Sequence, residues 1–414
     1  MTLSLWLDEP APARPGLRGD VRAPVAVVGA GLTGVAAAYW LTAHGVPAVV
    51  LEATAVGAGA TGRNGGFVLE GTSPDFVDVV ARYGRQAARD LWAFTVENRE
   101  RLADVCTREG LACGIERGGS VALAASPAEA AALERNAQLL AEDGYPSQWL
   151  DRAAVRTLLN GARAAEAFVG GLLNPRDLGI HPVRLTRGLA AAAERRGARI
   201  YEGTPVRALA ADGTTWSVAT AGGTVRAEAV VLALNAHTAL VDASWQAVVR
   251  PIRGQMLATA PVPQRLFRHL WYAHGGVDYW RQLADGRVVL GGLRRLAAAE
   301  EVGTEDRLHP RIQQALEDYL RDLGVPPVPV THRWSGILGL SPDRLPLIGP
   351  APDRPGLFVA GGYSGQGLAF AFLAGRMLAE LITTGTTAYP RLLYPARVMH
   401  GGRQPAPPPG ASHT

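Results

Sequence analysis

The chain has 414 residues, of which 48% are hydrophobic, and a formal net charge of +4 at pH 7. This length exceeds one ordinary domain, so we expect two domains with substantial apolar cores. The 41 basic residues are all arginine and are scattered, which gives little support to nucleic-acid binding. Because the sequence contains no lysine, a Schiff base to pyridoxal phosphate and a P-loop lysine are excluded.

Several features bear on the cellular setting. No apolar run approaches the length of a membrane span, and the stretch around Trp6 is too short for the core of a signal peptide. The two cysteines, Cys106 and Cys113, match neither a disulfide framework nor a metal-ligand set, and no two histidines have metal spacing. We therefore expect a cytoplasmic protein with no membrane span and no metal. The sequence leaves the oligomeric state open.

A strand–turn–helix unit opens the folded part of the chain. Apolar residues 25–28 lead into the glycine turn 29–34, and an Ala-rich helix is predicted over 32–43. Glycines there form a tight turn and let backbone amides approach phosphates, whose charge the helix N-terminus favours. Glu52 ends the next strand, about 20 residues beyond the turn, where an acid can bind ribose hydroxyls. The unit predicts a nucleotide site.

The middle of the chain adds helices and a second sheet. A capping box at Ser126 starts a helix that ends near Gly144, and His181-Pro182 opens another that ends at Gly197. A hairpin follows through 221–223, and a strand over 229–234 delivers Asn235 to a loop. From 250 to about 329 the alternating pattern predicts an antiparallel sheet with one helix over 310–323.

A second glycine-rich turn lies near the other end of the chain. The strand 357–360 runs into 361–368, which holds four glycines, and then into another helix. This segment has the same order of strand, glycine turn and helix as the first, and it provides a second helix N-terminus. One long dinucleotide held from both ends of the chain favours FAD over NAD.

We therefore predict an α/β fold (α+β overall), with a Rossmann-like FAD-binding domain and an inserted antiparallel β-sheet substrate domain covered by helices. The expected parts are an N-terminal extension over 1–23, an FAD-binding domain over 24–112, 175–246 and 331–390, a substrate domain over 113–174 and 247–330, and a disordered tail over 396–414.

Motifs spread over about residues 24 to 385 resemble the D-amino-acid-oxidase type of FAD-dependent oxidoreductases. That family includes glycine oxidase, sarcosine oxidase and γ-glutamylputrescine oxidase, and the last branch is the most similar. Besides the two glycine turns, the motifs are Gly57–Gly66, Arg253-Gly254-Gln255-Met256, Tyr279-Trp280-Arg281-Gln282-Leu283, Asp285-Gly286-Arg287, Trp334-Ser335-Gly336 and Pro342–Gly349.

The resemblance implies FAD as cofactor. Gly336 stands where sarcosine oxidases carry the cysteine bonded to flavin, so the FAD is expected to be non-covalent. The expected cofactor-binding residues are Gly29, Gly31, Leu32, Thr33, Gly34, Glu52, Ala53, Thr61, Arg63, Asn64, Gly65, Gly66, Val206, Asn235, Gly336, Gly362, Gly365, Gln366, Gly367 and Leu368.

The resemblance also implies oxidation of a C–N bond in an amine or amino-acid-like substrate, by hydride transfer to flavin N5. The resulting imine hydrolyses, and O2 is reduced to H2O2. A cage of aromatic residues would keep the amine dry and neutral. The candidates are Tyr279 and Gln366 as catalytic residues, and Phe67, Gln255, Tyr272 and Trp280 as substrate-binding residues.

Two positions differ from sarcosine oxidases, which use lysines beside the flavin and at the substrate carboxylate. Val289 and Ala369 are the approximate counterparts here, which puts fast reaction with oxygen in doubt. Three alternatives follow: an oxidase, a dehydrogenase that passes electrons to a quinone or carrier protein, and a flavin subunit that needs a partner chain.

Overall fold

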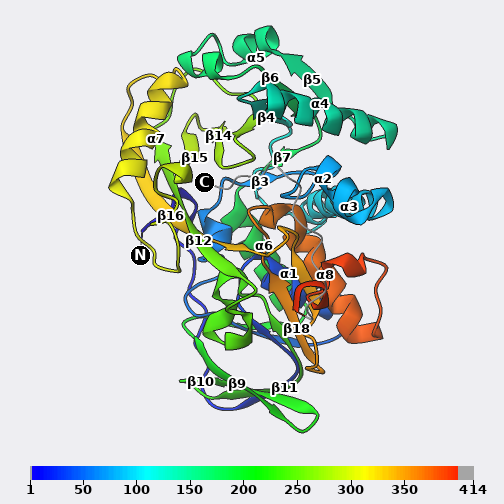
Figure 1. Ribbon diagram of the computed structural model, residues 1–414. Coiled ribbons are helices and arrows are strands. Elements are labelled where there is room, and N and C mark those ends of the chain that lie inside the picture. The colour runs from blue at the N-terminus through cyan, green and yellow to red at the C-terminus, as the bar shows by residue number, and fades with distance from the viewer. Residues whose placement is uncertain (1, 400–414) are drawn as a thin grey trace.

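The computed structural model describes residues 2–399 and places two large β-sheets in one molecule. In Figure 1 the first sheet occupies the lower part, with β9, β10 and β11 at its base, and the second lies above it. The chain crosses between the sheets several times, so each is assembled from distant segments.

The first sheet has a parallel centre, as a nucleotide-binding domain requires. Its strand order is β17-β18-β11-β1-β2-β8, and β1 pairs in parallel with both β11 and β2. The buried apolar runs of these strands suit a parallel sheet covered on both faces. The strands are β1 (Val21–Val28), β2 (Ala48–Leu51), β8 (Arg199–Tyr201), β9 (Val206–Asp212), β10 (Thr215–Thr220), β11 (Thr224–Leu232), β17 (Leu347–Pro350) and β18 (Leu357–Gly361).

Helices α1 (Leu32–Ala43) and α8 (Gly367–Thr384) pack against each other beside this sheet. They cross closely because Gly375 has no side chain: a Cβ atom there would lie 2.5 Å from Ala37 N. Contrary to the expectation from sequence, α8 is long and apolar enough to span a membrane. However, 67% of it is buried inside the protein, as in a core helix. Helices α3 (Arg85–Arg108) and α6 (Pro182–Arg195) complete the cover.

The second sheet has the order β16-β12-β15-β14-β13-β4-β6-β5 and is antiparallel except where β13 pairs in parallel with β4. It therefore confirms the inserted sheet, with one parallel pair that the sequence pattern did not indicate. Its strands are β4 (Ser120–Ala124), β5 (Gln148–Asp151), β6 (Gly170–Asn174), β12 (Arg250–Thr259), β13 (Leu270–Ala273), β14 (Asp278–Gln282), β15 (Val288–Gly292) and β16 (Val330–Leu340).

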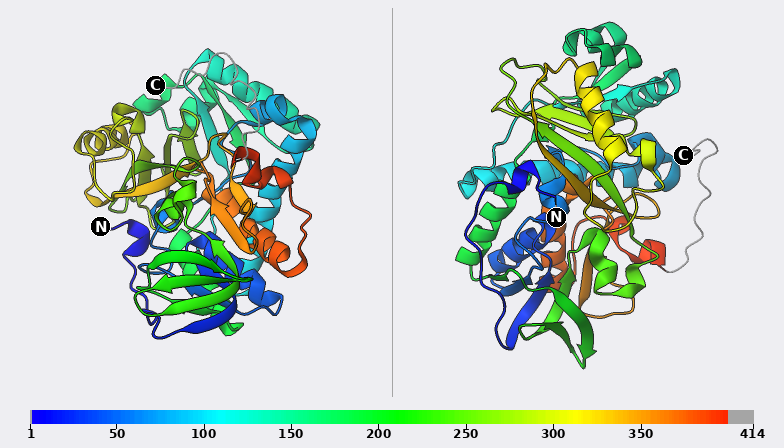
Figure 2. Two further views of the ribbon diagram at one scale, coloured as in Figure 1. Left: turned by 60° about the horizontal axis from the view of Figure 1, so that its bottom comes forward. Right: turned by 90° about the vertical axis from the view of Figure 1, so that its left-hand side faces the viewer.

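The two faces of the second sheet have different neighbours. Helix α7 (Pro310–Asp322) lies along one face, as Figures 1 and 2 show in yellow, and α5 (Arg152–Leu158) packs at its end. Trp271 and Trp280 point to this face and stack with their ring centroids 6.0 Å apart. Because strand residues alternate between faces, Tyr272 and Tyr279 point the other way.

Three predicted boundaries change. The last part of the FAD-binding domain was expected to begin at residue 331, but Val330–Leu340 pairs along β12 as a strand of the second sheet. Residues 396–399, assigned to a disordered tail, form the short helix α9 (Ala396–Met399), where Arg397 binds Asp343. The remainder of that tail, 400–414, lies outside the described residues. The expected N-terminal extension includes the start of β1 at Val21.

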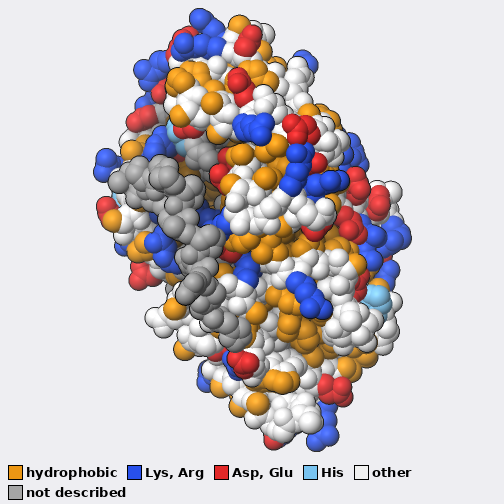
Figure 3. Space-filling view, turned by 45° about the vertical axis from the view of Figure 1, so that its right-hand side comes forward, with side chains coloured by type: hydrophobic (Ala, Val, Ile, Leu, Met, Phe, Trp, Pro, Cys, Tyr) orange, Lys and Arg blue, Asp and Glu red, His pale blue; other side chains and the backbone are white. Residues whose placement is uncertain are grey.

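The remaining predicted elements are found with small shifts. Ser126 caps α4 (Pro127–Glu142), and the imidazole of His181 caps α6 by accepting from Arg184 N at 3.2 Å. A short two-stranded sheet of β3 (Phe67–Val68) and β7 (Leu178–Gly179), together with α2 (Phe76–Tyr83), lies between the large sheets. On the face shown in Figure 3, arginine and acidic side chains are interspersed.

Candidate active site

The first glycine turn is shaped by two close backbone contacts that exclude side chains. A Cβ atom at Gly34 would lie 1.9 Å from Gly29 O, and one at Gly29 would lie 2.8 Å from Ala233 O. Gly29 also has φ +100°, which favours glycine. The turn therefore brings the N-terminus of α1 close to the ends of β1 and β11.

Glu52 lies at this same edge. Its carboxylate accepts hydrogen bonds from Ala30 N at 2.8 Å and from Thr54 N at 2.9 Å, so it is held beside the turn. Its carbonyl accepts from Thr204 N, which brings the following segment and Val206 to the same end of the sheet. Ala53 is exposed next to it. This arrangement fits an acid that binds a ribose.

The loop 57–66 folds back on the start of α1. Thr61 Oγ1 accepts from Leu32 N at 3.0 Å, and the Asn64 amide bonds to the carbonyls of Ala60 and Thr61. Asn64 Oδ1 in turn accepts from Gly66 N at 2.8 Å. Asn64 therefore holds the shape of the loop.

Arg63 is also engaged by protein groups. Its guanidinium donates to Ala58 O, Ser335 O and two oxygens of Thr2, and it pairs with Asp306 at 3.3 Å. The charge of Arg63 is matched by Asp306. In this structure Arg63 fastens the loop to the N-terminal segment.

The N-terminal segment, residues 2–9, lies across that loop. Ser4 Oγ donates to Gly62 O at 2.5 Å, and Trp6 Nε1 donates to Asn64 O at 2.7 Å. Both side chains are buried, at 0% and 1% exposure. The expected N-terminal extension thus packs against the glycine-rich loop 57–66 and supports it.

The second glycine turn joins the first. Tyr363, at its centre, is hydrogen-bonded to Thr33 of α1 with 2.8 Å between the hydroxyl oxygens. Asn235 Oδ1 accepts from Gly362 N at 3.0 Å, so Asn235 fixes this turn from the end of β11. Gly362 and Gly365 have φ +62° and +96°, and Gln366 and Gly367 begin α8, followed by Leu368.

These features fit FAD. Two helix N-termini with glycine-rich turns, one acid held beside the first turn and the folded-back loop lie along one connected edge of the first sheet. Gly336 lies against the loop 57–66, where a Cβ atom would be only 3.0 Å from Arg63 O. The two cysteines are buried in the core, 3.1 Å apart at sulfur.

The second sheet meets the glycine-rich loop through aromatic side chains. Tyr279 and Phe67 pack edge to face, with their ring centroids 6.0 Å apart. Gly65 permits this contact because a Cβ atom there would lie 3.1 Å from the Tyr279 ring. Tyr279 also covers Gly291, where a Cβ atom would meet the ring at 2.6 Å. Burial raises the pKa of Tyr279, so its hydroxyl stays protonated.

Trp280 does not lie on the face of β14 that carries Tyr279. It is fully buried on the opposite face of β14 and packs against Trp271, Phe267 and Tyr319 of α7. The reason is the two-residue alternation of a strand, which separates Trp280 from Tyr279. Its expected role as a substrate contact is therefore corrected to core packing.

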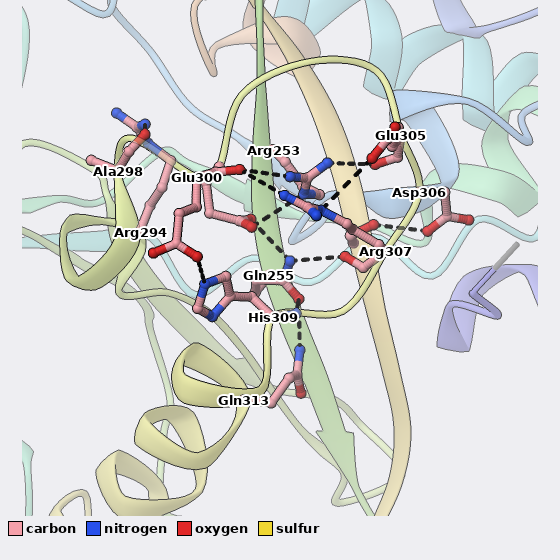
Figure 4. Close-up of polar contacts among 12 residues, drawn as sticks. Arg253, Gln255, Arg294, Ala298, Glu300, Glu305, Asp306, Arg307, His309 and Gln313 are labelled. Atoms are coloured by element: carbon pink, nitrogen blue, oxygen red, sulfur yellow. Dashed lines mark hydrogen bonds and ion pairs between the residues drawn. The ribbon is translucent and has the colours of Figure 1, made fainter.

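Gln255 is likewise on the α7 side of the second sheet. Figure 4 shows its amide inside a polar network: Nε2 donates to Glu301 and Arg307 O, while Oε1 accepts from His309 N and Gln313. The side chain is 0% exposed. With these bonds made inside the protein, Gln255 has no group left for a substrate, and its expected role is corrected to fold stabilisation.

Tyr272, opposite Tyr279 on the neighbouring strand, is partly exposed on the loop-facing side. Burial raises the pKa of its hydroxyl. Ser120 lies on the neighbouring strand β4, two residues before the partner of Tyr272 and on the same face. Ser120 Oγ donates to Asp177 Oδ2 at 2.5 Å. This places a buried carboxylate behind the tyrosine.

Sequence patterns missed two charged groups here. Arg281 shares the face of Tyr279, is 2% exposed, and donates to Gly66 O at 2.8 Å and Ile180 O at 3.2 Å. Side chains two residues apart on a strand point to the same face, so the position of Arg281 could have been predicted from that of Tyr279. Asp177 follows β6 in a loop, and no motif marks it.

Comparison with known proteins agrees with this geometry. The family model described as FAD dependent oxidoreductase (DAO) matches residues 24–381. The chain is 31% identical over 376 residues to γ-glutamylputrescine oxidoreductase of Escherichia coli, covering 88% of this chain and 85% of the relative.

Two further relatives have different names. Glycine oxidase of Geobacillus kaustophilus is 29% identical over 89% of this chain and 95% of its own. Its crystal structure superposes with a TM-score of 0.76 at 25% identity, covering 90% and 98% of the two chains. A D-amino acid dehydrogenase of Rhizobium johnstonii is 29% identical over 70% of this chain and 69% of its own.

The matched residues begin just before the first glycine turn and end within α8, the helix that follows the second glycine turn. The match therefore includes both glycine turns. The resemblance seen in the sequence motifs is confirmed. This chain belongs to the DAO family of FAD-dependent oxidoreductases, and its cofactor is FAD.

Proposed function

We propose that this protein oxidises the C–N bond of an amine or amino-acid-like substrate. The observation that carries the proposal is the position of Tyr279, which closes an aromatic wall against Phe67 and the glycine-rich loop. The relatives named for γ-glutamylputrescine, glycine and D-amino acids support the same class of substrate.

The residues of the site would position and desolvate the substrate. FAD, when bound, supplies the acceptor at N5 for the hydride that leaves the carbon next to nitrogen, and the imine product is hydrolysed by water to an aldehyde or keto compound. The rings of Tyr279 and Phe67 keep water from the reacting nitrogen. Tyr272, on the neighbouring strand, lines the other side of the substrate site. Gln366, at the start of α8, lies where the helix dipole favours negative charge.

We propose an oxidase that reduces O2 to H2O2, in the cytoplasm, with a dehydrogenase as the alternative. Val289 favours the alternative: it lies on β15 opposite Arg281, is 1% exposed, and stands where sarcosine oxidases have a lysine that helps to activate oxygen. The dehydrogenase name of one relative supports that alternative too. A flavin subunit that needs a partner chain is the third candidate.

Anaerobic mixing of the purified, FAD-loaded protein with a panel of amines and amino acids tests the proposal. Loss of the flavin absorbance with one class of compound, then recovery and peroxide on admitting air, is the expected result. Loss without recovery would instead indicate a dehydrogenase. If no compound in the panel bleaches the flavin until a partner protein is added, the isolated-enzyme proposal is wrong.

A further inference from the structure

A cavity of about 280 Å³ lies at the edge of the second sheet, where β13 begins and β14 ends. This volume suits a small charged group with a short carbon chain attached. The wall of the cavity is strongly basic, because four arginines line it together with a single acid. We call it the arginine cavity, and its ionisable lining residues are Glu116, Arg117, Arg265, Arg268, His269 and Arg281.

Backbone contacts fix the walls of the arginine cavity. Glu116 and Gly179 exchange two backbone hydrogen bonds, of 2.8 and 2.9 Å, which tie one wall to β7. Gly118 packs closely against the segment before β13, since a Cβ atom there would lie 2.4 Å from Arg268 O. His269 Nδ1 donates to Gly118 O at 2.6 Å across the same junction. The fold therefore holds the charged side chains around a defined space.

Arg281 is the most deeply buried of the four arginines, with 2% exposure. Its guanidinium lies 3.2 Å from the Glu116 carboxylate and donates to Gly66 O and Ile180 O. Its Nε is buried and has no hydrogen-bond partner among residues 2–399. Burial lowers the pKa of Arg281, and the Glu116 charge opposes this shift. A cation removed from water in this way is stabilised by a further anion close to it.

The other three arginines extend the positive charge to the surface. Arg265 Nη2 lies 3.9 Å from Glu116 Oε2, so it shares the carboxylate that already pairs with Arg281. Arg117 and Arg268 are exposed at the cavity. With one carboxylate for four guanidinium groups, the lining carries an excess of three positive charges. Guanidinium groups bind carboxylate and phosphate oxygens through paired N–H donors.

We propose that the arginine cavity binds the oxyanion group of a small molecule, a carboxylate or a phosphate. Arg281 lies on the same face of β14 as Tyr279, two residues further along, which is a separation of about 7 Å. Both side chains contact the glycine-rich loop, Tyr279 at Gly65 and Arg281 at Gly66. Two sources of the oxyanion fit this position: the far end of the amine substrate, and a separate free anion. Only the first source rests on the proposed function.

Calorimetric titration of the FAD-loaded protein with inorganic phosphate tests the site without turnover. The wild type should bind phosphate. The double variant Arg117→Gln/Arg268→Gln should bind it about fivefold more weakly, because two exposed charges that face the anion are lost. Arg281→Gln removes the buried charge and should weaken binding at least about tenfold. Retention of FAD shows that each variant is folded.

Arg207→Gln provides the matched control. Arg207 is exposed on β9 of the first sheet and lies outside the arginine cavity, so this variant loses one positive charge without altering the site. It should bind phosphate as the wild type does. A general effect of net charge would instead weaken binding in this variant too and would contradict a localised site.

Two amines of equal length, one ending in a carboxylate and one in the corresponding amide, separate the two sources. If the substrate supplies the oxyanion, the carboxylate compound should saturate anaerobic flavin reduction at lower concentration, and phosphate should compete with it. The double variant should then raise its apparent dissociation constant about fivefold and leave the limiting rate unchanged. If a free anion occupies the cavity, phosphate should bind without changing the saturation by either amine.

Equal phosphate affinity in the wild type, the double variant and Arg281→Gln, with FAD bound in all three, would overturn the proposal. Absence of phosphate binding, together with equal saturation by the two amines, would overturn it as well. If no amine reduces the flavin, the proposed function is wrong, and the phosphate titration still decides whether the arginine cavity is an anion site.

Discussion

The two sheets present their site residues in different ways. At the first sheet, the shape of the glycine turns depends on side chains being absent, as at Gly29 and Gly34. At the second sheet, the contacts come from side chains such as Tyr279, whose direction depends on which face of the strand they occupy. The first arrangement is sensitive to added volume, and the second to a change of one residue in register.

The largest expected effect concerns the first glycine turn. Gly34→Ala would place a methyl group 1.9 Å from Gly29 O, so the turn must open, and we expect loss of bound FAD. Gly16→Ala is the control, because its nearest neighbour would be 3.4 Å away. The flavin absorbance of each purified variant gives the measurement, and full FAD occupancy in Gly34→Ala would contradict the prediction.

The face of the second sheet that packs against α7 should contribute most to stability. Trp280→Leu leaves a cavity beside Trp271 and Tyr319, and we expect a loss of about 3 kcal/mol in the free energy of unfolding. Urea unfolding followed by far-ultraviolet circular dichroism measures it. A loss below about 1 kcal/mol would show that this face is not the packed core.

The buried acid should make stability depend on pH. The pKa of Asp177 is raised from 3.8 to about 7, so the folded protein binds a proton between these values that the unfolded chain releases. The free energy of unfolding should therefore fall as pH rises from about 4 to about 7. Asp177→Asn should reduce this fall, by at most about 4 kcal/mol. An identical pH dependence in both proteins would contradict the burial argument.

The smallest effect concerns the N-terminal segment. Trp6→Phe removes the hydrogen bond to Asn64 O but keeps most of the ring, which should cost about 1 kcal/mol, or roughly a fivefold weaker FAD affinity. Trp40→Phe is the control, since Trp40 Nε1 has no hydrogen-bond partner in the described structure. Titration of each apoprotein with FAD gives the affinities, and equal values for the two variants would exclude a role for this bond.

The sequence predicted the first sheet better than the second for a physical reason. The glycines at 29, 31 and 34, the strand before them and Glu52 after them are local signals, and the structure places them together. Arg63 and Asn64 were placed in the correct loop, but their hydrogen bonds depend on Thr2 and on the loop's own carbonyls. A motif alone does not specify such partners.

In the second sheet, the sequence identified the aromatic strand but not its orientation. Tyr279 and Trp280 are neighbours in sequence, and only the pairing with β13 and β15 decides which of them faces the loop. Gln255 shares a strand with Met256, and the same alternation sends it into the network beneath α7. The contact of Asp177 with Ser120 joins positions 57 residues apart.

The most direct test of this account is anaerobic flavin reduction in Tyr279→Leu and Trp280→Leu, with the amine that reduces the wild-type protein. We expect Tyr279→Leu to bind FAD and stay folded but to be reduced at least about tenfold more slowly. Trp280→Leu should be less stable yet be reduced at the wild-type rate under conditions where it is folded. The opposite pattern, with a slow Trp280 variant and an unchanged Tyr279 variant, would contradict the assignment of the substrate to the loop-facing side of the second sheet.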